Sequence, residues 1–236
     1  MQTAVRAVAM TGRGRVREGN EDAVLVFGWF TQSSEPAVVD LRAQPSRTVL
    51  CAVADGMGGH AAGEVASATA LVTAADRYLA WTTPGETAAG LVDINAELYD
   101  LANRGVETSG MGTTIAGVLV AADHAVCFNI GDSRVYDITR GTLTQLTVDD
   151  AVTGGLTQAL GDPPDPGPVP HVLELPLSTP TRLFLCTDGI SSVLDPGTLH
   201  NLCRIPDPVA LVDTLRTTVY GLGAPDNLTA VVLDIP

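Results

Sequence analysis

The sequence has no lysine, few aromatic residues and no long apolar run. All 13 basic residues are arginines, and 27 acidic residues outnumber them, so the formal net charge is −14. Nucleic acids and anionic membrane surfaces both repel so acidic a protein. No apolar stretch approaches the roughly 18 consecutive residues that a membrane-spanning helix needs. We therefore expect neither nucleic acid nor a membrane among the partners of this protein.

Cysteine is also scarce, and Cys51, Cys127, Cys186 and Cys203 form no Cys-x-x-Cys pair. The first three lie inside apolar runs, which favours buried free thiols over a disulfide framework or a zinc site. Arginines near the N-terminus interrupt any apolar segment of the kind found in a secretory signal peptide. We expect a cytoplasmic monomer, with residues 1–236 forming a single domain.

The most informative stretch is residues 49–60, VLCAVADGMGGH. An apolar run typical of a buried strand ends there on Asp55, and the glycines that follow allow the backbone to turn sharply. A second apolar run, residues 183–186, ends on Thr187-Asp188-Gly189. Two such strands would bring two carboxylates to one edge, where they repel each other unless a hard cation lies between them. This arrangement predicts a metal-dependent hydrolytic site.

Hydrophobic periodicity predicts the secondary structure in outline. The segments 23–30 and 37–40 are interpreted as paired strands of a hairpin or meander, because residues 31–36 have the composition of a turn. Strands and helices do not alternate regularly, which favours the α+β class over a doubly wound sheet. Helices are expected over 61–80, 87–104 and 209–220, and strands over 4–10, 23–30, 37–40, 49–54, 114–121, 125–130, 135–139, 143–146, 171–175, 182–186 and 228–235.

Three arginines alternate near the N-terminus, at Arg13, Arg15 and Arg17. An extended backbone would place all three on one face. They could form either a solvated edge or a local anion-binding patch, and Arg17 is the best candidate for binding an anion.

Four aspartates stand where an apolar run meets a loop: Asp22, Asp55, Asp188 and Asp226. Any one of them could be a turn former or a helix cap. Together they offer only oxygen ligands, with no histidine or cysteine cluster. This favours Mg²⁺ or Mn²⁺ over zinc.

The order of these motifs resembles one family, the metal-dependent protein phosphatases of type 2C in their bacterial form. The resemblance implies a four-layer α-β-β-α sandwich of two antiparallel sheets flanked by helices, with metals at one end. It also implies hydrolysis of phosphoserine and phosphothreonine by a metal-bridging hydroxide without a phosphoenzyme. The substrates would be proteins phosphorylated by a serine/threonine kinase. The matching pieces are residues 17–22, 55–60 with Glu64, 110–114 (GMGTT), 131–134, 156–161, 188–189 and 226–227.

The same resemblance implies roles for individual residues. Two Mn²⁺ or Mg²⁺ ions would be bound in the core, bridged by one carboxylate, and a third, weaker ion would bind beside them. Another residue would grip the substrate phosphate with a bidentate guanidinium fork. The resemblance makes Asp55 the bridging ligand and the Gly56 carbonyl, Asp188 and Asp226 the other core ligands. Asp132 would bind the third ion together with Asp188, and Arg17 would bind the phosphate. Glu21 and Asp22 would hold metal-bound waters, and Asn227 and His60 would lie around the site.

The sequence departs from the family in two places. Met57 stands where many eukaryotic members have a histidine proposed as the general acid, and His60 could assist or could serve only at a helix entry. Bacterial members usually carry Asp-His-Ser and then a flap subdomain, whereas this chain has Asp149-Asp150-Ala151 and reaches Leu156 almost at once. The missing flap leaves two alternatives open: a catalytically silent module that binds phosphoproteins, and a phosphatase of small metabolites.

Overall fold

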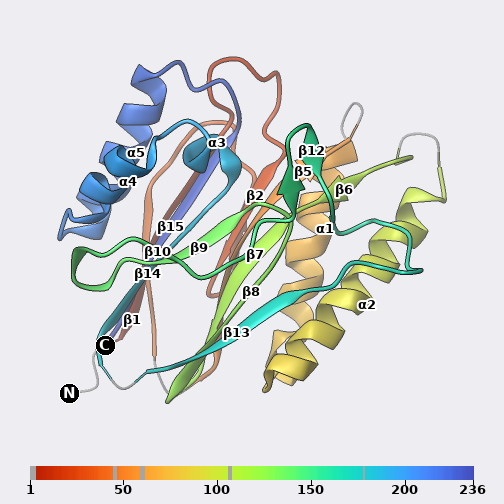
Figure 1. Cartoon of the computed structure of the whole chain (residues 1–236), viewed down its shortest axis with the longest axis horizontal. Coiled ribbons are helices and arrows are strands. Elements are labelled where there is room, and N and C mark those ends of the chain that lie inside the picture. Colours follow the sequence, from red (N-terminus) through yellow and green to blue (C-terminus); the bar gives the residue numbers. More distant parts are fainter. Residues whose placement is uncertain (1–3, 45–46, 59–61, 106–107, 178) are drawn as a thin grey trace.

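Two antiparallel sheets packed face to face form the centre of the molecule (Figure 1). The computed structural model describes residues 4–44, 47–58, 62–105, 108–177 and 179–236. The first sheet has the strand order β10-β9-β14-β15-β1-β4. Its strands are β1 (Val5–Gly12), β4 (Val39–Ala43), β9 (Arg134–Asp137), β10 (Thr144–Gln145), β14 (Thr181–Cys186) and β15 (Leu228–Ile235).

The second sheet has the order β13-β8-β7-β5-β2-β3, and the short strand β6 pairs with the end of β5. A separate two-stranded hairpin, β11 (Ala151–Val152) and β12 (Gly155–Leu156), stands apart from both sheets. The strands of the second sheet are β2 (Asp22–Val26), β3 (Trp29–Thr31), β5 (Val49–Met57), β6 (Gly112–Thr113), β7 (Ile115–Val120), β8 (His124–Ile130) and β13 (His171–Pro176).

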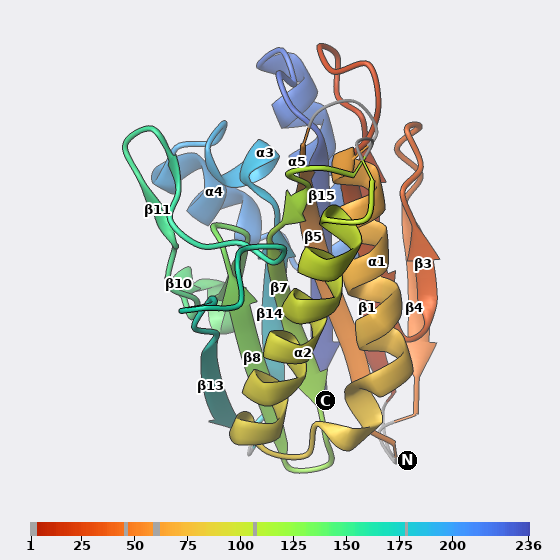
Figure 2. The same cartoon turned by 90° about the vertical axis from the view of Figure 1, so that its right-hand side faces the viewer.

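Helices cover the outer face of each sheet, as Figures 1 and 2 show. The second sheet is covered by α1 (Ala62–Arg77), the 3₁₀ turn η1 (Tyr78–Ala80) and α2 (Pro84–Ala102). The first sheet is covered by α3 (Asp188–Ser191), α4 (Pro196–Cys203) and α5 (Pro208–Gly221), and a 3₁₀ turn, η2 (Thr139–Gly141), follows β9. The predicted α+β class and the four-layer sandwich are therefore confirmed.

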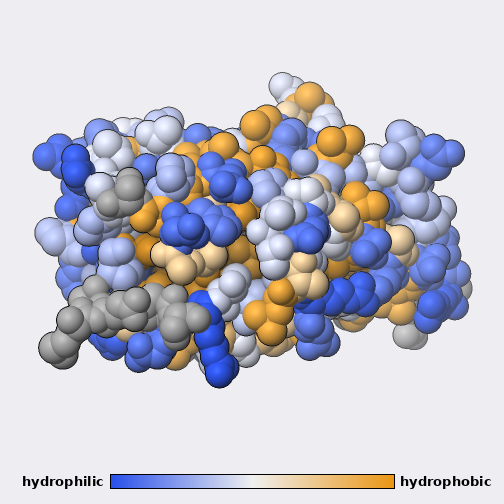
Figure 3. Space-filling model, turned by 90° about the horizontal axis from the view of Figure 1, so that it is seen from below, coloured by the Kyte–Doolittle hydropathy of each residue, from blue (hydrophilic) through white to orange (hydrophobic). Residues whose placement is uncertain are grey.

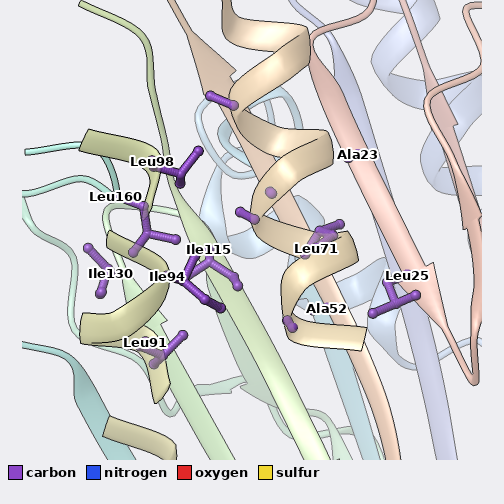
Figure 4. Packing of buried hydrophobic residues seen from close by; sticks show 14 of the residues in the cluster. Ala23, Leu25, Ala52, Leu71, Leu91, Ile94, Leu98, Ile115, Ile130 and Leu160 are labelled. Carbon is purple, nitrogen blue, oxygen red and sulfur yellow. The ribbon is translucent and has the colours of Figure 1, made fainter. Parts of the chain in front are cut away.

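Each interface between layers is filled with apolar side chains. Figure 4 shows the layer between α2 and the second sheet, where Leu91, Ile94 and Leu98 from one face of α2 pack with Ile115 of β7. The spacing of three and four residues along α2 places these side chains on one stripe of the helix. All are fully buried. Small and β-branched residues fill the layer between the two sheets, which lets the sheets approach closely. The core thus holds the strand ends that carry the acidic residues in fixed positions.

The predicted pairing of segments 23–30 and 37–40 is wrong. β2 turns instead into β3 through Phe27 and Gly28, whose φ angles of 52° and 89° suit a two-residue hairpin turn. β4 pairs with β1 in the other sheet. Helix α4 was not predicted, because its eight residues give little periodicity; Asp195 caps it by accepting hydrogen bonds from the backbone N–H groups of Gly197 and Thr198.

All four cysteines are free and buried, as the sequence predicted. Burial raises the pKa of the Cys127 and Cys203 thiols to about 12, so both remain protonated. Among the described residues, no helix combines the length and apolar character needed to cross a bilayer.

Candidate metal centre

The two sheets carry acidic residues to the same end of the molecule. Asp55 lies on β5 and is directly opposite Asp22 in the register with β2. From the other sheet, Asp188 begins α3 at the end of β14, and Asp226 precedes β15. Asp55 and Asp188 line one cavity of about 320 Å³, together with Asp132. Asp55 and Asp188 thus meet at one cavity although they are 133 positions apart in the sequence.

Asp22 is fully buried at the junction of the two sheets. Its Oδ2 accepts 2.7 Å hydrogen bonds from the hydroxyl groups of Thr187 and Thr229, which belong to the first sheet's strand ends. Its Oδ1 is buried and has no hydrogen-bond partner among the residues that the structure describes. A carboxylate oxygen of this kind lowers the stability of the folded state, because burial removes its hydrogen bonds to water and no protein donor replaces them.

Burial and the charges of neighbouring carboxylates raise the pKa of four acids in this cluster, Asp22, Asp55, Asp132 and Asp188. Burial is the largest cause at each: it raises the pKa of Asp22 to about 7 and that of Asp132 to about 6. The pKa of Asp55 lies well above its ordinary value because of burial and then the charges of Asp22 and Asp188. The pKa of Asp188 is raised by burial and by Asp226. The positive charge near these carboxyl groups is therefore too small to offset their burial and mutual repulsion.

The donor set fits divalent cations of the hard, oxygen-binding kind. Clustered carboxylates with raised pKa values and an orphaned buried oxygen are what such ions stabilise. The carboxylates do not already form a closed cage: within the described ranges, no three acidic, histidine or cysteine side chains converge closely enough to enclose an ion. Instead, Asp55 and Asp188 line one cavity, where the charge of Asp188 raises the pKa of Asp55, and Asp226 pairs with Arg17.

Gly56 allows the backbone to pack closely and does not form the sharp turn predicted. Gly56 and Met57 continue β5 and pair with Thr113 and Gly112 of β6. A Cβ atom on Gly56 would lie 2.0 Å from the carbonyl oxygen of Gly63 and 2.7 Å from that of Glu21. Only glycine therefore permits this contact between β5, the start of α1 and the loop before β2.

Asn227 fixes the loop that carries Arg17. Its side-chain nitrogen donates 2.9 Å hydrogen bonds to the carbonyl groups of Arg13 and Gly19, and its Oδ1 accepts from the backbone N–H of Glu21 at 2.8 Å. Asn227 is only 4% exposed. Glu21 itself is half-buried, and burial raises the pKa of its carboxyl group. Asn227 thus positions the loop, a role that its motif alone did not reveal.

Arg17 lies beside the acids, but the predicted arginine face does not exist. Gly14 adopts a φ of +75°, which folds the segment into a turn in place of an extended strand. Arg13 therefore donates to the carbonyl of Glu18, and the guanidinium group of Arg15 stacks over the ring of Tyr220. Arg17 alone points to the cluster, where its Nη2 donates to Oδ2 of Asp226 at 2.7 Å.

Asp132 reaches the cavity from the turn between β8 and β9. The backbone N–H of the preceding residue, Gly131, donates to Oδ2 of Asp150 at 2.9 Å. Oδ1 of Asp150 in turn contacts Gln158 and His171 at 2.7 and 2.9 Å. Asp150 therefore ties the Asp132 turn to the base of the β11–β12 hairpin.

Comparison with known proteins decides the family. A family model described as "Protein phosphatase 2C" matches residues 38–222. The chain belongs to the protein phosphatase 2C family. It is 31% identical to the serine/threonine protein phosphatase PstP of Mycobacterium tuberculosis over 253 aligned positions, which cover 98% of this chain and 45% of PstP. The chain thus spans about half the length of that curated relative.

Solved structures of family members share the whole fold. The catalytic domain of PstP, in complex with two manganese ions, superposes with a TM-score of 0.77 at 30% identity and 98% coverage of both chains. The serine/threonine phosphatase Stp1 of Staphylococcus aureus superposes with a TM-score of 0.83 at 25% identity, covering 100% of this chain and 97% of Stp1.

A short hairpin, β11–β12, borders the cavity that Asp55 lines. Ala151, Val152, Gly155 and Leu156 of the β11–β12 hairpin line the same cavity as Asp55. Val152 is 65% exposed, so an apolar side chain faces solvent at the rim. At the position where the sequence predicts a missing flap, the chain forms a hairpin of two residue pairs, joined by a turn at Thr153 and Gly154.

Two threonines of the family's GMGTT segment hold the backbone of Asp55. The hydroxyl of Thr113 donates to the Asp55 carbonyl at 2.9 Å, and the Asp55 N–H donates to Oγ1 of Thr114 at 3.0 Å. The sequence identified this segment as a motif but not this function. His60, the remaining residue predicted near the site, lies outside the described residues, while Met57 lines the cavity.

Proposed function

We propose that this phosphatase 2C chain is a metal-dependent serine/threonine protein phosphatase. The observation that carries the proposal is the meeting of Asp55 and Asp188, from different sheets, at one cavity. Mutual burial of these acids favours their protonated forms unless positive charge is supplied. A structural role alone does not account for acids that destabilise one another.

Two Mn²⁺ or Mg²⁺ ions are the proposed cofactors. Asp55 would bridge them, with the Gly56 carbonyl, Asp188 and Asp226 as the other ligands, and Asp132 with Asp188 would hold a weaker third ion. Glu21 and Asp22 would orient water in this region. Bound cations of this kind offset the charge of a phosphomonoester and lower the pKa of water toward neutrality.

The chain's own groups would bind and orient the phosphate. Arg17 remains charged, and its hydrogen bond to Asp226 raises its pKa further. A planar guanidinium group can grip two phosphate oxygens at once. Asn227 holds the loop of Arg17 against the start of β15, so the guanidinium approaches from a fixed backbone. Positioning of this kind is a large part of catalysis in phosphoryl transfer.

The proposed substrates are phosphoserine and phosphothreonine residues of proteins modified by a serine/threonine kinase. We further propose that the protein acts in the cytoplasm, a location that suits four buried, reduced cysteines. An alternative substrate class is a small phosphorylated metabolite, which the short β11–β12 hairpin would admit more readily than a flap.

Hydrolysis assays with purified protein test the proposal. We expect Mn²⁺-dependent release of phosphate from p-nitrophenyl phosphate and from a phosphothreonine peptide, and loss of both rates in EDTA. Higher kcat/KM on metabolites than on peptides would favour the metabolite alternative. Binding of phosphopeptide without turnover, and without any need for metal, would indicate a catalytically silent module instead.

A further inference from the structure

A second cavity lies at the ends of the strands opposite to the metal centre. Its volume is about 990 Å³. Arg182 lines it at the start of β14, whereas Asp188 follows the other end of the same strand, six positions away. At about 3.3 Å per residue, six positions span roughly 20 Å. Asp234 and Asp226 lie at opposite ends of β15 in the same way. The two sites are therefore separate.

This cavity concentrates positive charge in an acidic protein. Five of the 13 arginines line it, whereas Asp234 is the one acidic residue among the described residues of its lining. Cavities lined mostly by charges of one sign focus the electric field and attract ions of the opposite sign. The five arginines are Arg6, Arg42, Arg140, Arg182 and Arg204.

Two of these arginines are held by structural ion pairs. Arg6 lies opposite Asp234 in the β1–β15 register, and Arg182 lies opposite Asp234 in the β14–β15 register. Arg182 donates to both oxygens of Asp234, at 2.5 and 2.9 Å, and Arg6 donates to both oxygens of Asp40 at 2.9 Å. These pairs form a row of charges across the first sheet. Both ion pairs are half-buried, and their role in stabilising contacts between neighbouring strands accounts for them.

The other three arginines have no comparable structural role. Arg42 is 57% exposed and comes only within 3.7 Å of Asp40, which Arg6 already binds. Within the part of the chain that the structure describes, neither Arg140 nor Arg204 lies within 4.0 Å of a carboxylate oxygen. Both are exposed, and the stem of Arg204 lies against Gly141, next to Arg140. These guanidinium groups are available to a ligand.

The rest of the lining is largely apolar. Ile138, Pro180, Pro206 and Ile235 contribute to it. Figure 3 views the molecule from below and shows apolar surface exposed between hydrophilic groups. A simple inorganic anion would fill only a small part of this volume, which lies at the upper end of the range for small-molecule sites. The ligand that fits has an anionic part and an apolar body.

We propose that this cavity binds a phosphorylated small molecule with a flat apolar ring, of the size of a nucleotide. Guanidinium groups recognise phosphate by paired hydrogen bonds and also stack on aromatic rings. Arg42, Arg140 and Arg204 bind the phosphate groups, and the apolar lining contacts the ring. The site lies outside the catalytic centre, so its ligand is an effector and not a substrate.

Titration calorimetry on EDTA-treated protein tests this proposal without any need for turnover. We expect ATP to bind saturably with one-to-one stoichiometry, and at least tenfold more tightly than pyrophosphate. The double variant R140A/R204A should weaken ATP binding at least tenfold. Its matched control, R104A/R216A, removes the same charge at positions outside the cavity, after α2 and on α5, and should leave the affinity unchanged. R42A, which keeps both ion pairs of the row, should also weaken binding.

Four outcomes would overturn the proposal. They are the absence of saturable binding, equal losses in R140A/R204A and its control, pyrophosphate binding as tight as that of ATP, and loss of ATP binding in R17A with R140A/R204A unaffected. The last result would place the nucleotide in the catalytic centre. Because the protein is free of metal in these titrations, none of these results depends on phosphatase activity.

Discussion

Nη2 of Arg17 donates a 2.7 Å hydrogen bond to Oδ2 of Asp226, although the two residues are 209 positions apart. One is the proposed phosphate ligand and the other a proposed metal ligand. An ion bound at Asp226 would compete with Arg17 for this carboxylate, and the released guanidinium group could then reach a phosphate. The pair therefore couples the two proposed functions of the site.

Replacing Arg17 should affect substrate and metal in opposite directions. For Arg17→Ala we expect KM to rise more than kcat falls, because the lost contact is to the bound phosphate. The side chains of the pair are 50% and 33% exposed, so the pair is worth at most about 1 kcal/mol. Affinity for Mn²⁺ should thus rise by no more than about fivefold. Steady-state kinetics measure KM and calorimetry measures the affinity for Mn²⁺, with Arg216→Ala as the control. An unchanged KM or weaker binding of Mn²⁺ would count against the coupling.

Asp55→Asn should remove activity and spare the fold. The proposed bridging ligand is lost, so turnover of p-nitrophenyl phosphate should fall at least about a hundredfold. The neutral, isosteric side chain also relieves repulsion among buried acids, whose charges raise the pKa of Asp55. We expect the Tm in EDTA to match or exceed that of the wild type. A wild-type rate in this variant would show that Asp55 is not a ligand.

The metal-free protein should lose stability as pH rises through neutrality. Burial raises the pKa of Asp22 to about 7, compared with about 3.9 in an unfolded chain. The folded state therefore binds more protons between these values, and this contribution to stability is complete below about pH 4 and lost as pH rises through about pH 7. Relative to Asp22→Asn, the Tm of wild type in EDTA should fall between about pH 5 and about pH 8. A constant difference between the two proteins over this range would contradict the assignment.

Gly56→Ala should destabilise the protein through a backbone clash. The new Cβ would lie 2.0 Å from the Gly63 carbonyl oxygen, and forced overpacking costs about 1–3 kcal/mol or more. Gly85→Ala is the matched control, because a Cβ there meets nothing within 4 Å and Gly85 lies in α2. Urea unfolding compares the two. Equal free energies of unfolding for the two variants would mean that β5 and α1 can move apart without loss of stability.

Asn227→Ala should loosen the loop that carries Arg17. Three hydrogen bonds are lost, two of them to backbone carbonyl groups. We expect a loss of about 1–3 kcal/mol in unfolding free energy and a higher KM. Asn103→Ala, which removes an exposed asparagine at the end of α2, serves as the control. A stable variant with unchanged KM would show that the loop holds its shape without Asn227.

The sequence predicted the elements that have strong periodicity and the acids that end them. The last strand, residues 228–235, has the predicted bounds, and α2 buries the predicted Leu91, Ile94 and Leu98. Asp55 and Asp188 could be placed at one edge because each follows an apolar run, which fixes the end of a buried strand. Alternation alone could not show that Gly14 would take a φ of +75° and direct Arg13 and Arg15 away from Arg17.

Contacts between distant segments were beyond prediction from one sequence. Nothing local distinguishes Thr187 and Thr229 as the two hydroxyl donors to Asp22, because they meet it only when the two sheets pack. The pairing of β4 with β1 likewise depends on competition between two sheets for one short strand. Glycine at position 56 suggested a turn, whereas its actual role is to admit the Gly63 carbonyl.

An anomalous difference map from a crystal soaked in Mn²⁺ tests the central claim most directly. We expect two ions within bonding distance of the Asp55 carboxylate, with Asp188 and Asp226 as further ligands and Asp226 turned away from Arg17. A map with no ion at Asp55, or with manganese bound only at other surface acids, would contradict the proposed metal centre.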